Sequence, residues 1–293
     1  MGESSFFSGY EKFTQEKEFD FAKNSTIGCG GKAKIAFFPK TVEEAVELLK
    51  RLECDRRPFY VLGNLSNVLP PDGETDTAIV CTKNLNAVRT DGETYAEAGT
   101  LSGSFLRACK EAGKTGAEFL LGIPCTLGGA LFMNAGAADT YLSTVVKTVF
   151  VYERGKTYLV PVEECGYAYK KSIFMENGAV ILGAYFHLAN ATRAEISKKL
   201  AFYNARRAHL PKGKSMGCVF KNPFGESAGR LIEGAGVKGL RIGGGIVSPE
   251  HANFILNDRH ATGKDIKALI ALAKNAVWRQ YRIRLEEEIR YFT

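Results

Sequence analysis

The stretch GIPCTLGGALFMNAGA, residues 122–137, decides the predicted fold. Glycine and alanine dominate it, so few side chains remain to fill a core. Small residues let a ligand approach the backbone closely, and glycine allows the positive φ that a binding loop needs. Pro124 rigidifies the entry, and Asn134 offers donors and an acceptor to the edge of a heterocycle. Tight helix–strand packing is the alternative, but we favour a cofactor-binding segment.

A second glycine-containing segment, GNLSN (Gly63–Asn67), directly follows a predicted strand. Small polar residues at a strand end expose backbone N–H groups, and such a concavity binds anions. The segment lacks the G-x-G-x-x-G spacing of the dinucleotide-binding fingerprint. An ordinary loop is the plainer interpretation, so GNLSN alone is a weak signal.

Helices and strands are predicted along the whole chain around these two segments. Residues 41–53 predict a helix with a Thr N-cap and an acidic first turn, and strands at 33–40, 57–63 and 77–82 complete a small α/β unit with a crossover helix. A strand-rich region follows, with an amphipathic helix from Ser102 and a hairpin over 145–162. Helices are then predicted over 193–211, 227–236 and 262–283.

The composition is that of an ordinary soluble globular chain, with 45% hydrophobic and 24% charged residues. A length of 293 residues suits two or three domains. Only the first dozen or so residues lack a clear period, and we expect no disorder beyond them. No segment reaches the roughly 18 apolar residues that span a bilayer, and the N-terminus has no signal-peptide pattern. We therefore expect no membrane partner.

The seven cysteines are scattered without C-x-x-C spacing, which argues against a disulfide framework or a metal site and favours a reducing cytoplasm. The net charge of +7 reflects either a slightly basic solvated surface or an attraction for anionic small molecules such as nucleotides. Lysines and arginines are never interleaved with aromatic residues in a patch. We therefore expect no nucleic-acid partner.

The segment SMGCVFKNPFGESAGRLIEGAG, residues 215–236, places Cys218 beside a glycine and just before Lys221 and Asn222. A lone intracellular cysteine is most often a small buried hydrophobe, so catalysis is the minor interpretation on the residues alone. His251 could serve as a base, although a structural histidine is the safer interpretation. The acidic run LEEEIR, residues 285–290, is typical of a solvated end with at most one inward carboxylate.

Taken together, these segments resemble the UDP-N-acetylenolpyruvoylglucosamine reductases (MurB), in order from Asn24 to Arg290. NSTIGCGGKA looks like the family's NT-x-G-x-GG-x-A, GNLSN like its G-x-GSN, and GIPCTLGGALFMNAGA like its GIPGT-x-GGA-x-x-MNAGA. The segments ECGYAYKKSIF, SMGCVFKNP, AGRLIEGAGVKGLRIGGGIVSPEHANFILN and LEEEIR follow in family order and spacing.

The resemblance implies an α+β fold with a two-part FAD-binding region of the VAO/PCMH type and a C-terminal α+β domain for a UDP-sugar substrate. We place the domains at residues 1–82, 83–190 and 191–293. NADPH would reduce the flavin, which would pass a hydride to the enolpyruvyl ether of UDP-N-acetylglucosamine and yield UDP-N-acetylmuramate for peptidoglycan. Negative charge builds on the neighbouring carbon and carboxylate, so the site needs cations or acids there and a general acid.

The resemblance also implies specific contacts. Cofactor contacts are expected from Gly63, Asn64, Leu65, Ser66, Asn67, Pro124, Cys125, Thr126, Gly128, Gly129, Asn134 and Gly136. Substrate contacts are expected from Tyr169, Lys221, Asn222 and His251.

Three residues match the family's catalytic positions, and two of them depart from its pattern. Lys170 stands where the family has an Arg that stabilises the carboxylate, and lysine lacks the planar two-pronged guanidinium. Cys218 stands where the family has a Ser proton donor; an ordinary thiol, with a pKa of about 8.5, is mostly protonated at neutral pH and can donate. Glu288 is retained.

Further departures lie near the predicted cofactor and substrate segments. Cys125 replaces a Gly of the flavin segment, His209 and Leu210 replace a Lys and a Gln, and Pro70 and Pro71 follow the GNLSN loop. Two other classes therefore stay open. One is a flavin- or nucleotide-binding paralogue with lost or altered catalysis. The other is a flavoprotein oxidase, whose covalent flavin could attach only at Cys125. We favour a working cytoplasmic reductase that acts as a monomer and serves cell-wall formation, cell shape, division and the cell cycle.

Overall fold

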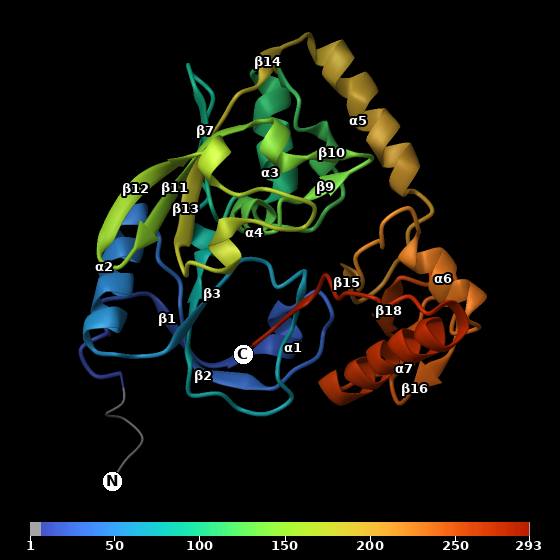
Figure 1. Cartoon of the computed structure of the whole chain (residues 1–293). Coiled ribbons are helices and arrows are strands. Elements are labelled where there is room, and N and C mark those ends of the chain that lie inside the picture. The colour runs from blue at the N-terminus through green and yellow to red at the C-terminus, as the bar shows by residue number, and fades with distance from the viewer. Residues whose placement is uncertain (1–6, 293) are drawn as a thin grey trace. The chain divides into compact units, whose positions relative to one another are not determined.

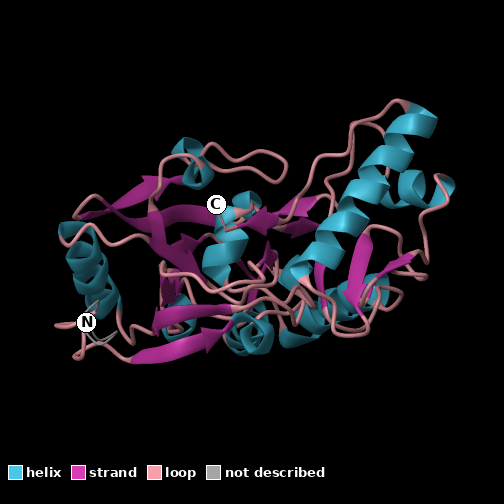
Figure 2. Cartoon of the chain, turned by 90° about the horizontal axis from the view of Figure 1, so that it is seen from below, coloured by secondary structure: helices cyan, strands magenta, loops and turns pink. Residues whose placement is uncertain are grey.

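A computed structural model describes residues 7–292, and the described residues form two compact units, each built from separated segments of the chain. Unit 1 contains residues 7–18, 34–64 and 76–206, and unit 2 contains residues 19–33, 65–75 and 207–292. Helices and strands are mixed through both, as Figures 1 and 2 show, which confirms the α+β prediction. The three-part division at residues 82 and 190 stays a prediction. Among the described residues, no helix is long and apolar enough to cross a membrane.

Unit 1 contains a four-stranded sheet with the order β1-β2-β5-β3, in which β2 and β3 run parallel to β5. The strands are β1 (Gln15–Asp20), β2 (Lys32–Phe37), β3 (Phe59–Leu62) and β5 (Ala78–Cys81). β1 lies in a segment without any sequence period, and Tyr10 and Phe13 just before it are nevertheless buried. Aromatic packing in the core therefore orders a stretch that its own pattern left undefined.

Helix α2 (Val42–Cys54) connects β2 to β3 as predicted. The Thr41 side chain accepts a hydrogen bond from the N–H of Glu44, which satisfies one of the unpaired donors of the first turn. The face that carries Leu48, Leu49 and Leu52 is fully buried in the core of this region. An N-cap and an apolar stripe at helical spacing thus fix this helix.

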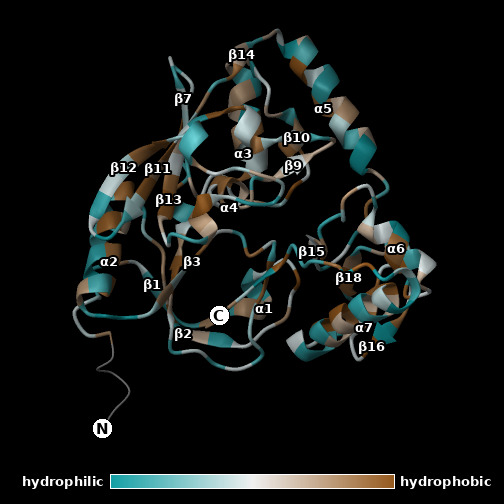
Figure 3. Ribbon diagram, viewed as in Figure 1, coloured by the Kyte–Doolittle hydropathy of each residue, from teal (hydrophilic) through white to brown (hydrophobic). Residues whose placement is uncertain are grey.

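A five-stranded antiparallel sheet with the order β12-β11-β13-β7-β6 forms the rest of the framework of unit 1. Its strands are β6 (Val88–Arg89), β7 (Thr94–Glu97), β11 (Val146–Glu153), β12 (Lys156–Pro161) and β13 (Val180–Phe186). The hairpin predicted over 145–162 is formed by β11 and β12, and its turn consists of two residues with positive φ, Arg154 and Gly155. In Figure 3 much of the hydrophobic colour lies on these strands.

The remaining elements of unit 1 are short apart from α3 and α5. They are α3 (Ser102–Glu111), α4 (Leu127–Phe132), α5 (Arg193–Arg207), β8 (Lys114–Thr115), β9 (Gly136–Ala137), β10 (Thr140–Tyr141) and β14 (Ala189–Asn190). Single 3-10 turns lie at Thr82–Asn84, Glu118–Leu120, Leu142–Thr144, Val162–Glu164 and Ile173–Met175. Part of the predicted cofactor-binding segment is therefore a helix, α4, and not only a loop.

Unit 2 is built on an antiparallel sheet with the order β15-β18-β17-β16, against which α7 packs (Figure 1). Its elements are α1 (Phe21–Asn24), β4 (Val68–Leu69), β15 (Ser215–Cys218), α6 (Ala228–Gly234), β16 (Arg241–Ile242), β17 (Gly245–Val247), β18 (Phe254–Asn257), α7 (Gly263–Tyr281) and β19 (Arg290–Tyr291). A capping box of Thr262 and Asp265 starts α7, and Asp72 also accepts from the N–H groups of Gly263 and Lys264.

Replacing Leu48 by Ala is expected to destabilise the protein by about 2–5 kcal/mol, because it leaves a cavity beneath α2. Guanidinium unfolding of the purified protein measures the change. Lys50→Ala, an exposed position of the same helix, is the control and should change stability by less than about 0.5 kcal/mol. Equal losses for the two variants would contradict the packing assigned to α2.

Candidate functional site

The beginning of the GNLSN loop lies against the start of the glycine-rich segment within unit 1. The side-chain amide of Asn64 donates to the carbonyl of Pro124 at 2.8 Å. A Cβ atom at Gly63 would lie 2.1 Å from Oγ1 of Thr126, so only glycine permits this approach. Two motifs about 60 residues apart in the sequence are therefore neighbours, as a shared cofactor site requires.

The rest of the loop belongs to unit 2 and leaves backbone donors available. Leu65 has a φ of 46° and a buried side chain, so it can offer a ligand only its backbone. Within residues 7–292, the backbone N–H groups of Leu65, Ser66 and Asn67 donate to no other protein group. Consecutive free amides of this kind suit a phosphate.

The two neighbouring glycines of α4 are there for different reasons. A Cβ at Gly128 would lie 2.9 Å from Cβ of Ala98, and the N–H of Gly128 donates to the carbonyl of Ala98. Tight packing therefore explains Gly128. Gly129 is exposed, and a Cβ there would meet nothing closer than Oγ1 of Thr126 at 3.6 Å. The chain itself does not need glycine at this position, so the open space fits the close approach of a cofactor.

The other predicted cofactor residues of this segment are engaged within the protein. The Thr126 hydroxyl accepts from the N–H of Gly129 and caps α4. Gly136 lies so close to Thr140 that a Cβ would be 2.3 Å from the Thr140 carbonyl oxygen. Cys125 is buried in the apolar core of unit 1. Burial of its sulfur is unfavourable to the covalent flavin link that an oxidase would need.

Asn134 is buried and holds two other segments in place. Its Nδ2 donates to the carbonyl of Ala168 at 3.0 Å, and its Oδ1 accepts from the N–H of Ser143 at 3.0 Å. The sequence predicted that this amide contacts the cofactor, and that contact stays a prediction. In the structure the amide supports the turn that carries Lys170.

Tyr169 and Lys170 form the tip of a two-residue turn. Ala168 and Lys171 exchange backbone hydrogen bonds of 3.2 Å on either side of it. Lys170 has a φ of 54°, a left-handed conformation that costs a residue with a side chain roughly 1–2 kcal/mol. Tyr169 is exposed, with its ring edge-on to Tyr141. Lys171, the residue after Lys170, forms an ion pair with Glu176.

In unit 2, main-chain hydrogen bonds bring the segments of Cys218 and Glu288 together. The N–H of Glu288 donates to the carbonyl of Val219 at 2.8 Å, and the N–H of Lys221 donates to the carbonyl of Glu286 at 2.8 Å. Phe220 and Glu287 form a bridge between these two segments. The predicted thiol donor and carboxylate, 70 positions apart in sequence, therefore lie on neighbouring backbone segments.

Two asparagines position this pair, and sequence reasoning did not assign them that role. Nδ2 of Asn67 donates to the carbonyl of Glu288 at 3.1 Å, and its carbonyl accepts from the N–H of Arg290. Asn253 is buried, and its side-chain amide both accepts from and donates to the backbone of Phe220. The HAN cluster around Asn253 was the only sequence signal for it.

The acidic C-terminal run is more engaged than a solvated end. Glu286 forms an ion pair of 2.5 Å with Lys221. Burial raises the pKa of Glu287, but hydrogen bonds from Lys274 and Tyr291 outweigh it and hold that pKa below its usual value. Glu286 nevertheless stays exposed, so Glu287 supplies the inward carboxylate for which the sequence left room.

The predicted substrate residues of unit 2 also have internal partners. Lys221 pairs with Glu286, as above, and Oδ1 of Asn222 accepts from the N–H of Ala228 at the start of α6. Nδ1 of His251 accepts from the N–H of Asn253 at 3.2 Å, so its ring proton is on Nε2. This contact supports the structural interpretation of His251, and the substrate contacts of all three stay predictions.

All seven cysteines are free thiols, and Cys218 differs from most of them in exposure. Burial raises the pKa of Cys29 to about 11 and the pKa values of Cys109 and Cys165 to about 12, so these thiols stay protonated. Cys218 is only half-buried, and Cys54 is exposed on α2. Cys218 is thus accessible enough to meet a ligand.

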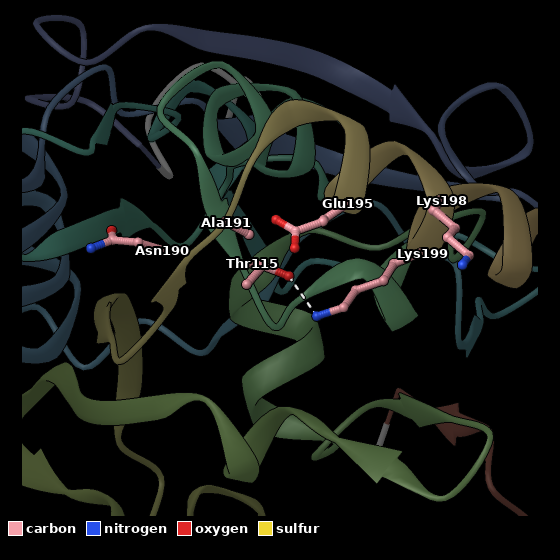
Figure 4. A pocket seen from close by; sticks show the side chains of 6 residues that line it. All are labelled: Thr115, Asn190, Ala191, Glu195, Lys198 and Lys199. Atoms are coloured by element: carbon pink, nitrogen blue, oxygen red, sulfur yellow. Dashed lines mark hydrogen bonds between the residues drawn. The ribbon is translucent and has the colours of Figure 1, made fainter.

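One pocket of unit 1 lies apart from every predicted site residue. Its volume is about 360 Å³, and its lining consists of Thr115, Asn190, Ala191, Glu195, Lys198 and Lys199 (Figure 4). Lys199 donates to the Thr115 hydroxyl at 2.8 Å. The polar lining is already paired in part, and it includes none of the residues predicted to be catalytic.

The contact between two glycine-dependent segments in unit 1 is consistent with the cofactor region of a flavoprotein. In agreement, residues 33–158 match the family described as FAD binding domain. Residues 208–292 match the family described as UDP-N-acetylenolpyruvoylglucosamine reductase, C-terminal domain.

The chain belongs to the UDP-N-acetylenolpyruvoylglucosamine reductase family. It is 37% identical to the reductase of Caldicellulosiruptor bescii, over 96% of this chain and 94% of that protein. It is 32% identical to the reductase of Clostridium beijerinckii, again over 96% and 94%. The crystal structure of the MurB reductase from Thermus caldophilus is similar with a TM-score of 0.83 at 33% identity, and the match covers 96% of this chain and 99% of that one.

The structure accounts for some departures from the family pattern. Pro70 packs on Gly30, where a Cβ would lie 2.8 Å from the proline ring, and the carbonyl of Pro71 accepts from the N–H of Gly31. The two prolines thus fit the GG pair of the opening motif. Nothing in the structure explains His209 and Leu210.

His251 is expected to titrate below the ordinary histidine value of about 6.5, chiefly because burial lowers its pKa. The unfolded chain binds a proton near that value and the folded chain does not. Stability should therefore fall as the pH drops below about 6.5, until the folded-state pKa is reached. Nitrogen NMR of the labelled ring measures both the titration midpoint of His251 and the nitrogen that carries the proton. A proton on Nδ1, or a midpoint above 6.5, would contradict the assignment.

Proposed function

We propose that this protein uses NADPH to reduce the enolpyruvyl ether of UDP-N-acetylglucosamine to the lactyl ether, UDP-N-acetylmuramate. The observation that supports the proposal is the backbone pairing of Val219–Lys221, directly after Cys218, with Glu286–Glu288. The relatives that match the chain almost from end to end are named as UDP-N-acetylenolpyruvoylglucosamine reductases.

The residues of the cofactor region fit FAD. The free amides of Leu65, Ser66 and Asn67 would hold phosphate oxygens, and the open position at Gly129 would admit the cofactor close to the backbone. Bound there, FAD supplies hydride transfer between the nicotinamide and the substrate. The remaining cofactor residues predicted from the sequence belong to the same proposal.

The substrate's reaction sets the task of the three catalytic residues. Hydride addition to the terminal carbon leaves negative charge on the neighbouring carbon and its carboxylate. Lys170 would stabilise that charge from its rigid turn, Cys218 would donate the proton from Sγ, and Glu288 would supply a second acid–base group beside it. Lysine gives a single point charge where arginine gives a fork, so we propose a weaker hold on the carboxylate.

Substrate contacts, cellular site and assembly belong to the same proposal. Tyr169, on the tip beside Lys170, would contact the substrate together with Lys221, Asn222 and His251. We propose that the protein acts as a monomer in the cytoplasm and engages neither nucleic acid nor membrane. Through peptidoglycan precursor synthesis it would serve cell-wall formation, cell shape, cell division and the cell cycle.

The purified protein should show a flavin spectrum that bleaches with NADPH and recovers with the enolpyruvyl substrate without oxygen. Both half-reactions follow from the same bound cofactor, so stopped-flow absorbance measures them separately. NADH in place of NADPH is the control for the nicotinamide. Bound flavin that never recovers with substrate would refute the proposal and favour a paralogue with altered catalysis.

Cys218→Ala should leave flavin reduction by NADPH unchanged and slow reoxidation by substrate about 100-fold, because the proton donor is lost. Cys54→Ala, an exposed cysteine on α2, is the matched control and should affect neither step. Equal slowing of both half-reactions by Cys218→Ala would show a general defect and not the loss of a proton donor.

A further inference from the structure

We infer that Ser172, a fully buried residue to which the family comparison assigns no role, positions Lys170 for the reaction. The inference rests on the proposed function, because it concerns how the chain holds the cation that faces the substrate carboxylate. Ser172 acts through the turn Ala168–Lys171 and touches neither substrate nor cofactor.

The turn needs support from outside itself. The two backbone hydrogen bonds between Ala168 and Lys171 that close it are long, at 3.2 Å each, and Lys170 at its tip has a left-handed φ of 54°. A residue with a side chain keeps such a conformation only when its surroundings enforce it. The long lysine side chain extends from this backbone, so a fixed turn fixes the point from which the ammonium group reaches out.

Ser172 supplies one of two anchors. Its hydroxyl donates to the carbonyl of Phe132 at 2.6 Å, directly after the turn. On the other side, Nδ2 of Asn134 donates to the carbonyl of Ala168 at 3.0 Å. Phe132 and Asn134 are only two residues apart, at the end of α4.

Both strands of the turn are therefore fastened to one short stretch of the glycine-rich segment. The N–H of Ile173 also donates to the carbonyl of Cys165, which fixes the chain beyond Ser172. Because the anchor point continues the segment proposed to hold the cofactor, the cation and the cofactor region share one rigid frame within unit 1. A shift of about 1 Å in such a frame is enough to slow a reaction by up to 100-fold.

The experiment is a double-mutant cycle on the two half-reactions, with Lys170→Ala, Ser172→Ala and the double variant. Ser172→Ala should slow flavin reoxidation by substrate about 10- to 100-fold and leave flavin reduction by NADPH unchanged. Once Lys170 is alanine, Ser172→Ala should have little further effect on reoxidation, because its action passes through Lys170. Lys171→Ala, at the neighbouring lysine paired with Glu176, is the control and should leave both steps unchanged.

Additive effects of Ser172→Ala and Lys170→Ala would overturn the inference, as would equal slowing of both half-reactions. If Ser172→Ala fails to fold with flavin, the same cycle is run with Ser172→Cys. This variant keeps a side chain of similar shape and replaces the hydroxyl donor to the Phe132 carbonyl with a weak thiol donor. A wild-type protein that binds flavin but is not reoxidised by substrate would refute the proposed function itself, and the inference would fall with it.

Discussion

The main-chain pairing of Val219–Lys221 with Glu286–Glu288 is the constraint on which the proposed chemistry depends. Backbone hydrogen bonds fix the distance between two segments irrespective of side-chain flexibility. The backbone of Glu288 is thus held next to the residue that follows Cys218. Asn67 and Asn253 extend this constraint, because each bonds the backbone of one of the two segments. The buried side-chain amide of Asn253 satisfies both the N–H and the carbonyl of Phe220, which would otherwise need a partner strand.

In unit 1 the corresponding constraint is close backbone packing at glycines, which have no side chain. Gly63 lies against Thr126, and Gly128 against Ala98, at separations that no Cβ would allow. These contacts shape the segment, and Gly129 then remains open toward a ligand. The same stretch holds the turn of Lys170 through Asn134 and the Phe132 carbonyl. One glycine-rich segment therefore contains both the open position at Gly129 and the anchors of the turn that carries Lys170.

The unusual residues of this chain are tolerated for different physical reasons. Cys218 keeps a transferable proton in place of a hydroxyl, and the half-buried position keeps it accessible. Cys125 turns into the core and so behaves as a small hydrophobe. Lys170 preserves the positive charge of an arginine but not its planar fork. Pro70 and Pro71 fit the space left by Gly30 and Gly31.

The sequence by itself determined the longer helices, the N-cap at Thr41, the hairpin over 145–162 and the family resemblance, because these depend on local spacing and on ordered motifs. It could not show that residues 19–33 and 65–75 join the C-terminal unit, or that residues 7–18 are ordered around Tyr10 and Phe13. Nor could it separate Gly128 from Gly129, or reveal Ser172, Asn67 and Asn253 as supports. Those roles arise from hydrogen bonds and packing between residues far apart in the chain, which only the tertiary structure brings together.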